Sequence, residues 1–240
     1  MDSSAELQRG ACKVEQRSHY RVLAALLEYP GAEYPQRVRQ IRNSLDGLYP
    51  DACAELDRFL QLLPVDDLTS MQELYTRSFD VQAMTTLDVG YVLFGDDYKR
   101  GVLLANLNSE YREVDLDTGT ELADHIPNLL RLMELLKDEE VLHDLAYAIL
   151  APALLEMIRE FSADRIEKRN ASYKKHYKTL IETPAVKVNA FTLYQHALQA
   201  LYEVLKQDFS LIEEIPLKRS CDFLASVDRE NEIEERASAH

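Results

Sequence analysis

The sequence predicts an all-α protein, folded as a single-domain bundle of about nine or ten helices. Hydrophobic residues make up 46% of the 240 positions, enough to bury a sizeable core. Only 7 residues are Gly and 8 are Pro, while the strong helix formers Leu, Ala, Glu, Lys, Arg and Gln dominate. Apolar residues also recur at intervals of three and four along most of the chain, which is typical of amphipathic helices.

We expect three segments along the chain. Residues 1–17 are polar and predict a flexible N-terminus. Residues 18–215 predict one all-helical domain, in which no internal repeat stands out. Residues 216–240 are highly charged and predict a disordered tail.

The first half of the domain predicts four helices. The segment SHYRVLAALLEYP carries an apolar helical stripe that ends at Pro30, and YPQRVRQIRNSL continues with a second one. A third helix is expected to start at Pro50, since proline is favoured in the first turn of a helix. The fourth follows an acidic cap at Asp66 or Asp67 and continues to Phe79.

The helical pattern stops between Asp80 and Gly95. The sequence there, DVQAMTTLDVGYVLFG, is too irregular for a helix and too apolar for a solvated loop, so it predicts a packed connection. Asp96 or Asp97 is then expected to cap the helix of YKRGVLLANLNSEYREV. The turn DLDTGT ends this region.

The second half of the domain predicts further long helices. ELADHIPNLLRLMELL has Asp124 as its expected cap and Pro127 in its first turn. DEEVLHDLAYAILAPALLEMIREF follows as a long apolar helix that Pro152 should kink or divide. Residues 163–178 are basic and predict an exposed helix, and Asn189 is expected to cap the last amphipathic helix.

Charge and cysteine content exclude several classes of partner and site. The formal net charge of −15 disfavours nucleic acid and anionic lipid and favours a basic partner. The basic stretch at 163–178 is then either a solvated face or a partner-docking surface. Cys12, Cys53 and Cys221 are far apart, which argues against a zinc site or a disulfide framework. We expect a cytoplasmic, soluble, unexported protein, because neither a signal peptide nor about 18 continuous apolar residues occur.

Enzyme chemistry finds little support in the motifs. A helical-bundle metal enzyme would need two Glu-x-x-His pairs, and the chain has one, Glu140 with His143. No nucleophile signature and no glycine-rich phosphate loop occurs either. The motifs therefore give no positive indication of an enzyme, and a catalytic triad scattered along the chain stays open.

Two short segments leave both a structural and a functional interpretation open. Capping accounts for Asp124, whereas His125 beside it is suited either to a structural contact or to a binding groove. Phe79 fits a core or a groove wall. Asp80 lies where a helix ends, a position that the helix dipole disfavours for an acid, so its carboxylate needs a compensating partner, internal or foreign.

Three segments in the middle third of the chain carry a combination of motifs. They are MQELYTRSFD at 71–80, GDDYKRGVLLANLNSEYREV at 95–114 and GTELADHIPNLLRLMELL at 119–136. Together they resemble the NarJ branch of the TorD-like redox enzyme maturation chaperones, which have a helix ending in Phe-Asp, a GD-x-x-x-RG helix ending in Tyr, and a Glu-Leu-Pro-Asp-x-x-Pro element. The residues at matching places are Tyr75, Phe79, Asp80, Gly95, Asp96, Arg100, Gly101, Tyr111, Glu121, Leu122, Asp124 and Pro127.

The sequence departs from the family pattern at two places. Ala123 stands where the family usually has proline, and TTLDVGYVLFGDD lacks the histidine that often precedes the GD pair. The pair Asp124 and His125 is closer to the TorD and DmsD branches. The resemblance therefore indicates a divergent member of the family that serves another enzyme.

The resemblance implies a function and a site. Family members are chaperones that bind the N-terminal leader, or its remnant, of the catalytic subunit of a DMSO-reductase-type molybdoenzyme. They support insertion of molybdenum guanine dinucleotide, which is the client's cofactor, before membrane docking or export, and they do not insert into the membrane. The resemblance thus implies a protein that is not an enzyme and that holds no cofactor stably, in agreement with the lack of catalytic motifs. The client's substrate (nitrate, another oxyanion, a sulfoxide or a hydrocarbon) and the state of the chaperone as monomer or dimer stay open. The implied peptide-binding residues are Tyr75, Phe79, Asp80, Arg100, Tyr111, Asp124, His125 and Pro127. A helical adaptor with a different partner is the alternative.

Overall fold

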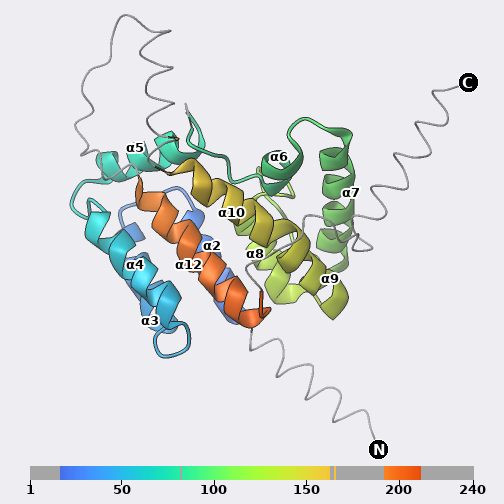
Figure 1. The fold of residues 1–240 in the computed structure, drawn as a ribbon, viewed down its shortest axis with the longest axis horizontal. Helices are drawn as coiled ribbons and strands as arrows, with labels where there is room; N and C mark the ends of the chain where they lie inside the picture. The colour runs from blue at the N-terminus through green and yellow to red at the C-terminus, as the bar shows by residue number, and fades with distance from the viewer. Residues whose placement is uncertain (1–16, 82, 163–164, 166–191, 212–240) are drawn as a thin grey trace, which may run out of the picture. The chain divides into compact units, whose positions relative to one another are not determined.

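The computed structural model describes residues 17–81, 83–162, 165 and 192–211 (Figure 1). The predicted all-α fold is confirmed over these residues, where the only β feature is an isolated bridge between Asp88 and His125. Most of the predicted N-terminus and basic helix, the cap at Asn189 and the predicted tail lie outside the described residues.

The helices fall into two compact units, each built from segments that are distant in the sequence. Within the described residues the first unit contains 17–24, 88–153 and 209–211, and the second contains 25–81, 83–87, 154–162, 165 and 192–208. One of the boundaries between the two units lies inside the helix Ala151–Glu160, after Ala153.

In the first unit, α2 and α8 form the main helix pair (Figure 1). Tyr20 and Leu23 of α2 are buried, as are Leu129 and Met133 of α8. α6 packs against α7 and η2. The helical elements of this unit are α2 (Ser18–Ala24), α6 (Val89–Phe94), α7 (Tyr98–Glu113), α8 (Ile126–Leu135), α9 (Glu139–Asp144), the π-helical η2 (Leu145–Leu150) and the beginning of α10 (Ala151–Glu160).

In the second unit, α4 and α12 lie side by side and form the largest helix contact (Figure 1). A side-chain hydrogen bond joins the two helices, with Nδ1 of His196 on α12 lying 2.7 Å from Oε2 of Glu55 on α4. The elements of this unit are the 3-10 helix η1 (Ala25–Leu27), α3 (Tyr34–Ser44), α4 (Pro50–Leu62), α5 (Leu68–Phe79), the remainder of α10 and α12 (Leu193–Asp208).

Several helix starts follow the predicted capping residues. Asp67 caps α5 by accepting a hydrogen bond from the Ser70 amide, and Asp97 caps α7 through the Lys99 amide. Pro50 opens α4 as expected. The carboxylates of Asp67 and Asp97 accept hydrogen bonds from backbone amides that a helix leaves unpaired in its first turn.

The connection before α7 contains one helix that the sequence pattern did not predict. Val89–Phe94 forms α6, with Val89 and Gly90 buried, while Tyr91 of the same turn is exposed. A single short turn of helix has too few residues to display a helical period, so its apolar sequence was indistinguishable from a packed loop.

Pro152 marks the expected junction in the long apolar helix. The π-helical η2 ends directly before α10, whose second residue is the proline. Proline has no N–H to donate and its ring clashes with the carbonyl four residues earlier, and the wider π turn is a common way to accommodate such a break.

The helix at Glu139–Glu160 has the length and composition of a membrane span, although it lacks a continuous apolar run of that length. Just over half of its most apolar window is buried inside the protein, as in a core helix.

Candidate functional site

The eight residues that the resemblance implies for peptide binding divide between the two units. Arg100, Tyr111, Asp124, His125 and Pro127 belong to the first unit. The remaining three belong to the second. The structure therefore describes two separate groups of predicted site residues, one in each unit.

The first group centres on an ionic cluster of Asp88, Gly90, Arg100, Asp124 and His125, here called the Asp124 cluster. Oδ2 of Asp124 accepts hydrogen bonds from Nε of Arg100 at 3.1 Å and from the Gly90 amide at 3.1 Å. Nη2 of Arg100 donates to Oδ2 of Asp88 at 3.1 Å. Nδ1 of His125 lies 3.1 Å from the other oxygen of Asp88. One arginine thus joins two carboxylates, and the second carboxylate orients the histidine.

Backbone contacts fix the same residues in place. Asp88 and His125 form the isolated antiparallel bridge, and the Val89 amide donates to the Asp124 carbonyl at 3.0 Å. These bonds bring the start of α6 beside the start of α8. The Tyr111 hydroxyl of α7 donates to the Ala123 carbonyl at 3.0 Å and supports the same turn from another side.

The two carboxylates of the cluster differ in how far they are exposed to solvent. The side chain of Asp124 is 0% exposed and that of Asp88 is 25% exposed. Burial raises the pKa of Asp124 above its usual value, because the ionised form loses its hydration. The hydrogen bond from His125 is the main cause that lowers the pKa of Asp88, and Arg100 adds to it. Within the described part of the chain, Oδ1 of Asp124 is buried and accepts no hydrogen bond.

The structure corrects the predicted role of Asp124. The N-cap position of α8 is His125, and no side chain caps this helix. The Asp124 carboxylate turns instead to the Gly90 amide and to Arg100, because an interior charge needs the strongest donors within reach. Because the Asp124 side chain is 0% exposed, it cannot contact a bound molecule directly.

The other predicted residues of the first unit differ in accessibility. Tyr111 is 3% exposed and Pro127 is buried in the first turn of α8, as expected for that proline. The side chains of Arg100 and His125 keep 18% and 15% exposure. Only Arg100 and His125 of this group can therefore touch a bound molecule without rearrangement.

In the second unit, Tyr75 and Phe79 belong to an aromatic core. The centre of the Phe79 ring lies 4.9 Å from the centre of the Tyr194 ring and 5.2 Å from the centre of the Tyr75 ring. The Tyr75 hydroxyl donates to the Leu27 carbonyl at 3.1 Å. These edge-to-face contacts favour the core interpretation of Phe79 over a groove wall.

Asp80 is the predicted residue that stays at the surface of the second unit. It is exposed and occupies the C-cap position of α5, where its amide donates to the Thr76 carbonyl at 2.8 Å. The helix dipole disfavours a negative charge at this end.

Sequence reasoning missed two members of the Asp124 cluster, Asp88 and Gly90. Both lie in the connection that was expected to be packed but featureless. An isolated glycine in an apolar run was the available signal, because it often marks a close approach to the backbone. A β-carbon at Gly90 would lie 2.6 Å from Oδ2 of Asp124, so this approach is real.

The alternative metal site gains no further ligand from the structure. Glu140 and His143 are both exposed, and His143 stacks on Tyr147 at 5.7 Å between ring centres. Among the described residues, no group of three or more His, Cys, Asp or Glu side chains is placed to hold a metal ion.

No protein-family model and no curated protein sequence matches this chain.

Replacing Gly90 with alanine is expected to destabilise the protein by about 1–3 kcal/mol, because the new β-carbon would collide with the fixed Asp124 carboxylate. The matched control is Gly101→Ala in α7, where a β-carbon meets nothing within 4 Å. That change should stabilise by about 0.5–1 kcal/mol. Urea unfolding measures both, and equal effects of the two substitutions would contradict the described contact.

Replacing Asp88 with asparagine is expected to reduce the loss of stability in acid. The lowered pKa means that ionised Asp88 stabilises the fold above its unfolded pKa, near 3.8, and that this contribution is lost as the pH falls through the folded pKa. The raised pKa of Asp124 acts with the opposite sign, since the folded state then binds the proton more tightly.

Urea unfolding at several pH values below about 5 tests this assignment. The fall in unfolding free energy with acid should be smaller in Asp88→Asn than in the unsubstituted protein, and larger in Asp124→Asn. The same fall in all three proteins would show that neither carboxylate is coupled as described.

Proposed function

We propose that this protein is a non-enzymatic chaperone for the catalytic subunit of a DMSO-reductase-type molybdoenzyme. It binds a basic and apolar N-terminal segment of that subunit, the leader or its remnant, and keeps the subunit competent to receive molybdenum guanine dinucleotide. The cofactor belongs to the client. Membership of the NarJ or TorD-like chaperones is part of this proposal.

The observation that carries the proposal is the meeting of two separate motifs in one cluster. Arg100 comes from the GD-x-x-x-RG segment and Asp124 from the Glu-Leu-x-Asp segment, and their side chains form a hydrogen bond 24 residues apart in sequence. His125, the residue shared with the TorD and DmsD branches, joins the same cluster through Asp88. Two of the three motifs on which the resemblance depends thus meet in one local framework of the first unit, while the Phe-Asp motif lies in the second unit.

Asp88 is the acid of that framework that a cationic ligand could reach, since Asp124 is fully buried. Two carboxylates face one guanidinium, and Asp88 with His125 retains contact with solvent. The net charge of −15 adds a long-range field that accelerates encounter with a basic segment and disfavours acidic partners. Binding is therefore expected to weaken as salt is added, while apolar contacts maintain a part of it.

The proposal gives six of the eight predicted residues one of two roles. Asp124, Tyr111 and Pro127 are buried and hold the turn before α8, so they position the exposed groups. Arg100 and His125 are the accessible members of the first unit, and Asp80 is the accessible member of the second. None of them is assigned to catalysis.

Replacing Asp80 with asparagine is expected to weaken binding of a basic and apolar peptide about two- to fivefold, the effect of losing one exposed charge pair. The probe is a synthetic peptide with adjacent arginines followed by an apolar stretch, titrated in a calorimeter. The unfolding free energies of both proteins, measured by urea unfolding, separate a loss of peptide affinity from a loss of fold.

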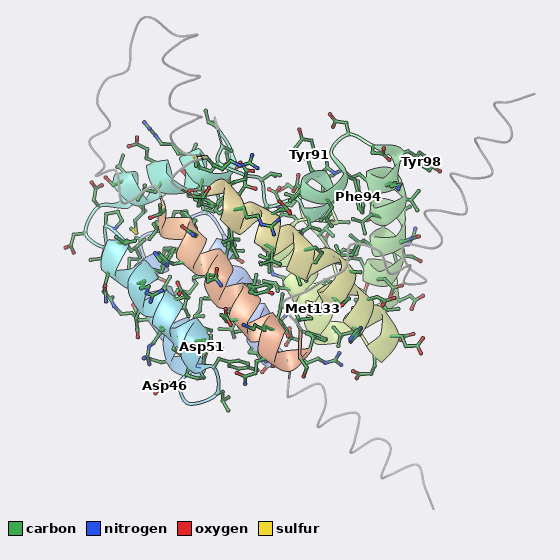
Figure 2. All side chains as sticks on the ribbon, viewed as in Figure 1. Asp46, Asp51, Tyr91, Phe94, Tyr98 and Met133 are labelled. Atoms are coloured by element: carbon green, nitrogen blue, oxygen red, sulfur yellow. The ribbon has the colours of Figure 1, made fainter. Side chains whose placement is uncertain are left out.

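Asp51→Asn is the matched control for this experiment. Asp51 is exposed in the first turn of α4, in the same unit, and its replacement changes the net charge equally (Figure 2). The Asp51→Asn protein should bind the peptide as tightly as the unsubstituted protein does. If both substitutions weaken peptide binding equally, Asp80 contributes only through the net charge of the protein and not through a direct contact with the peptide.

The function itself is tested in cells that lack the protein. Loss of cofactor-loaded molybdoenzyme, restored by the unsubstituted chain, is the expected result. Normal assembly of every molybdoenzyme in those cells would favour the helical adaptor with a different partner.

A further inference from the structure

The two oxygens of the buried Asp124 carboxylate have unequal surroundings. Oδ2 accepts hydrogen bonds from the Gly90 amide and from Nε of Arg100, each at 3.1 Å. Oδ1 is buried and has no hydrogen-bond partner among the residues that the structure describes. A carboxylate can accept hydrogen bonds on both oxygens, whereas a protonated carboxyl group has a hydroxyl on one of them. The donors are thus arranged as for a carboxyl group whose proton lies on Oδ1.

Charged and titratable groups face Asp124 from the elements around it. Burial is the largest cause that raises the pKa of Asp124, and the negative charge of Asp88, before α6, raises it further. Arg100 of α7 lowers it. Tyr111 of α7 also faces the carboxylate, because burial raises the pKa of this tyrosine and the charge of Asp124 raises it further. His125 pairs with Asp88 on the side of α8.

The remaining titratable residues of α6, η2 and α8 each contact another side chain. These contacts are Tyr91 with Arg100, Tyr147 with His143, Arg131 with Asn128 and Glu134 with Arg21. The cation that pairs with Asp124 is therefore the Arg100 guanidinium, which is shared with Asp88.

Asp124 also joins the start of α6 to the start of α8. The Val89 amide donates to the Asp124 carbonyl at 3.0 Å, and the Gly90 amide donates to the side chain of the same residue. The bridge between Asp88 and His125 lies beside these bonds. α6 is only 6 residues long, and so short a helix is not stable without contacts to the rest of the fold. The position of α6 therefore depends in part on one carboxyl group.

The charge of Asp124 affects the stability of this junction between α6 and α8. While the junction is closed, the carboxyl group is buried and its pKa is raised. If the junction opens, the group meets water and its pKa returns towards its usual value of 3.8. The closed junction therefore binds a proton more tightly than the open one. By linkage, a proton bound to Asp124 stabilises the closed junction.

We propose that the junction of α6 and α8 is a proton-sensitive latch, which closes more tightly when Oδ1 of Asp124 binds a proton from solvent. Two carboxylates and one guanidinium, with His125 counted as neutral, give the Asp124 cluster a charge of −1, and the proton brings this charge to 0. Oδ2 still accepts from the Gly90 amide and from Arg100. Loss of the proton restores the negative charge and loosens the latch.

The latch goes beyond the proposed function, because it concerns how the fold closes around one carboxyl group. Acid usually weakens a protein whose carboxylates are paired, whereas mild acid would tighten this junction. Asp88 and His125 keep contact with solvent at the same place, so opening of the latch changes the surface that they form.

Nuclear magnetic resonance of the protein labelled with nitrogen-15 in its 7 glycines reports the proton directly, because the Gly90 amide is bonded to Asp124. Gly119 is the matched control, since its amide donates to the exposed carboxylate of Asp117 at 3.0 Å. Protonation of a carboxylate moves the signal of the amide bonded to it. In a titration from about pH 8 to about pH 3, the Gly90 signal should move at a higher pH than the Gly119 signal. Movement of both signals at the same pH would overturn the proton site.

Hydrogen exchange of the Gly90 amide measures the latch itself. Its protection, relative to an unstructured chain at the same pH, reports the free energy of local opening. Between about pH 7 and about pH 4.5, this protection should increase as the pH falls, by up to about tenfold for each pH unit below the pKa of the closed state. Asp88 does not interfere in this range, because its contribution is lost only near and below its unfolded pKa of 3.8. Constant or falling protection would overturn the latch.

Two variants identify the group that binds the proton. Asp124→Asn keeps the shape of the side chain without a titrating group, and it should abolish the pH dependence of Gly90 protection. His125→Gln should keep that dependence, and it is the control for an imidazole, since histidine side chains commonly titrate in this range. Persistence of the dependence in Asp124→Asn, or its loss in His125→Gln, would assign the proton to another group and overturn the inference.

The test remains decisive if Asp124→Asn does not fold. The Gly90 signal and its protection are then compared between the unsubstituted protein and His125→Gln, with Gly119 as the internal control. No peptide is present in any of these measurements, so a failure of the latch leaves the chaperone proposal intact.

Discussion

A fully buried carboxylate, that of Asp124, constrains the arrangement of the first unit. An ionised group without water must find strong donors, and the chain supplies the Gly90 amide of α6 and the guanidinium of Arg100 of α7. Because the donors come from two helices and the acid precedes a third, satisfying one charge fixes three chain segments. The requirement for glycine at position 90 follows, since a β-carbon would occupy the space of the carboxylate.

This constraint also separates the part of the site that holds its shape from the part that meets solvent. Asp124 and Tyr111 are inside, whereas Asp88, Arg100 and His125 reach the surface in part. The inner part therefore holds the start of α8 in place, and the outer part is what the proposed function assigns to the binding of a basic segment.

The sequence predicted the fold better than the site, for physical reasons. A cap at Asp66 or Asp67, another at Asp96 or Asp97, and a first-turn proline at Pro127 were recognisable because these signals depend on neighbours in the sequence, and Asp67 and Asp97 are the caps in the structure. Asp124 has the same local pattern, but its carboxylate satisfies a distant amide and a distant arginine, which no local rule specifies. Asp88 was missed because its partners, Arg100 and His125, come from two other segments.

A double-mutant cycle between Arg100 and Asp124 tests the central constraint most directly. The unfolding free energies of the unsubstituted protein, Arg100→Gln, Asp124→Asn and the double variant give the interaction energy of the pair. A contact in which the acid is fully buried and which joins three segments predicts a coupling of at least about 1.5 kcal/mol. Additive effects, within about 0.5 kcal/mol, would show that the two side chains do not depend on each other and would contradict this account.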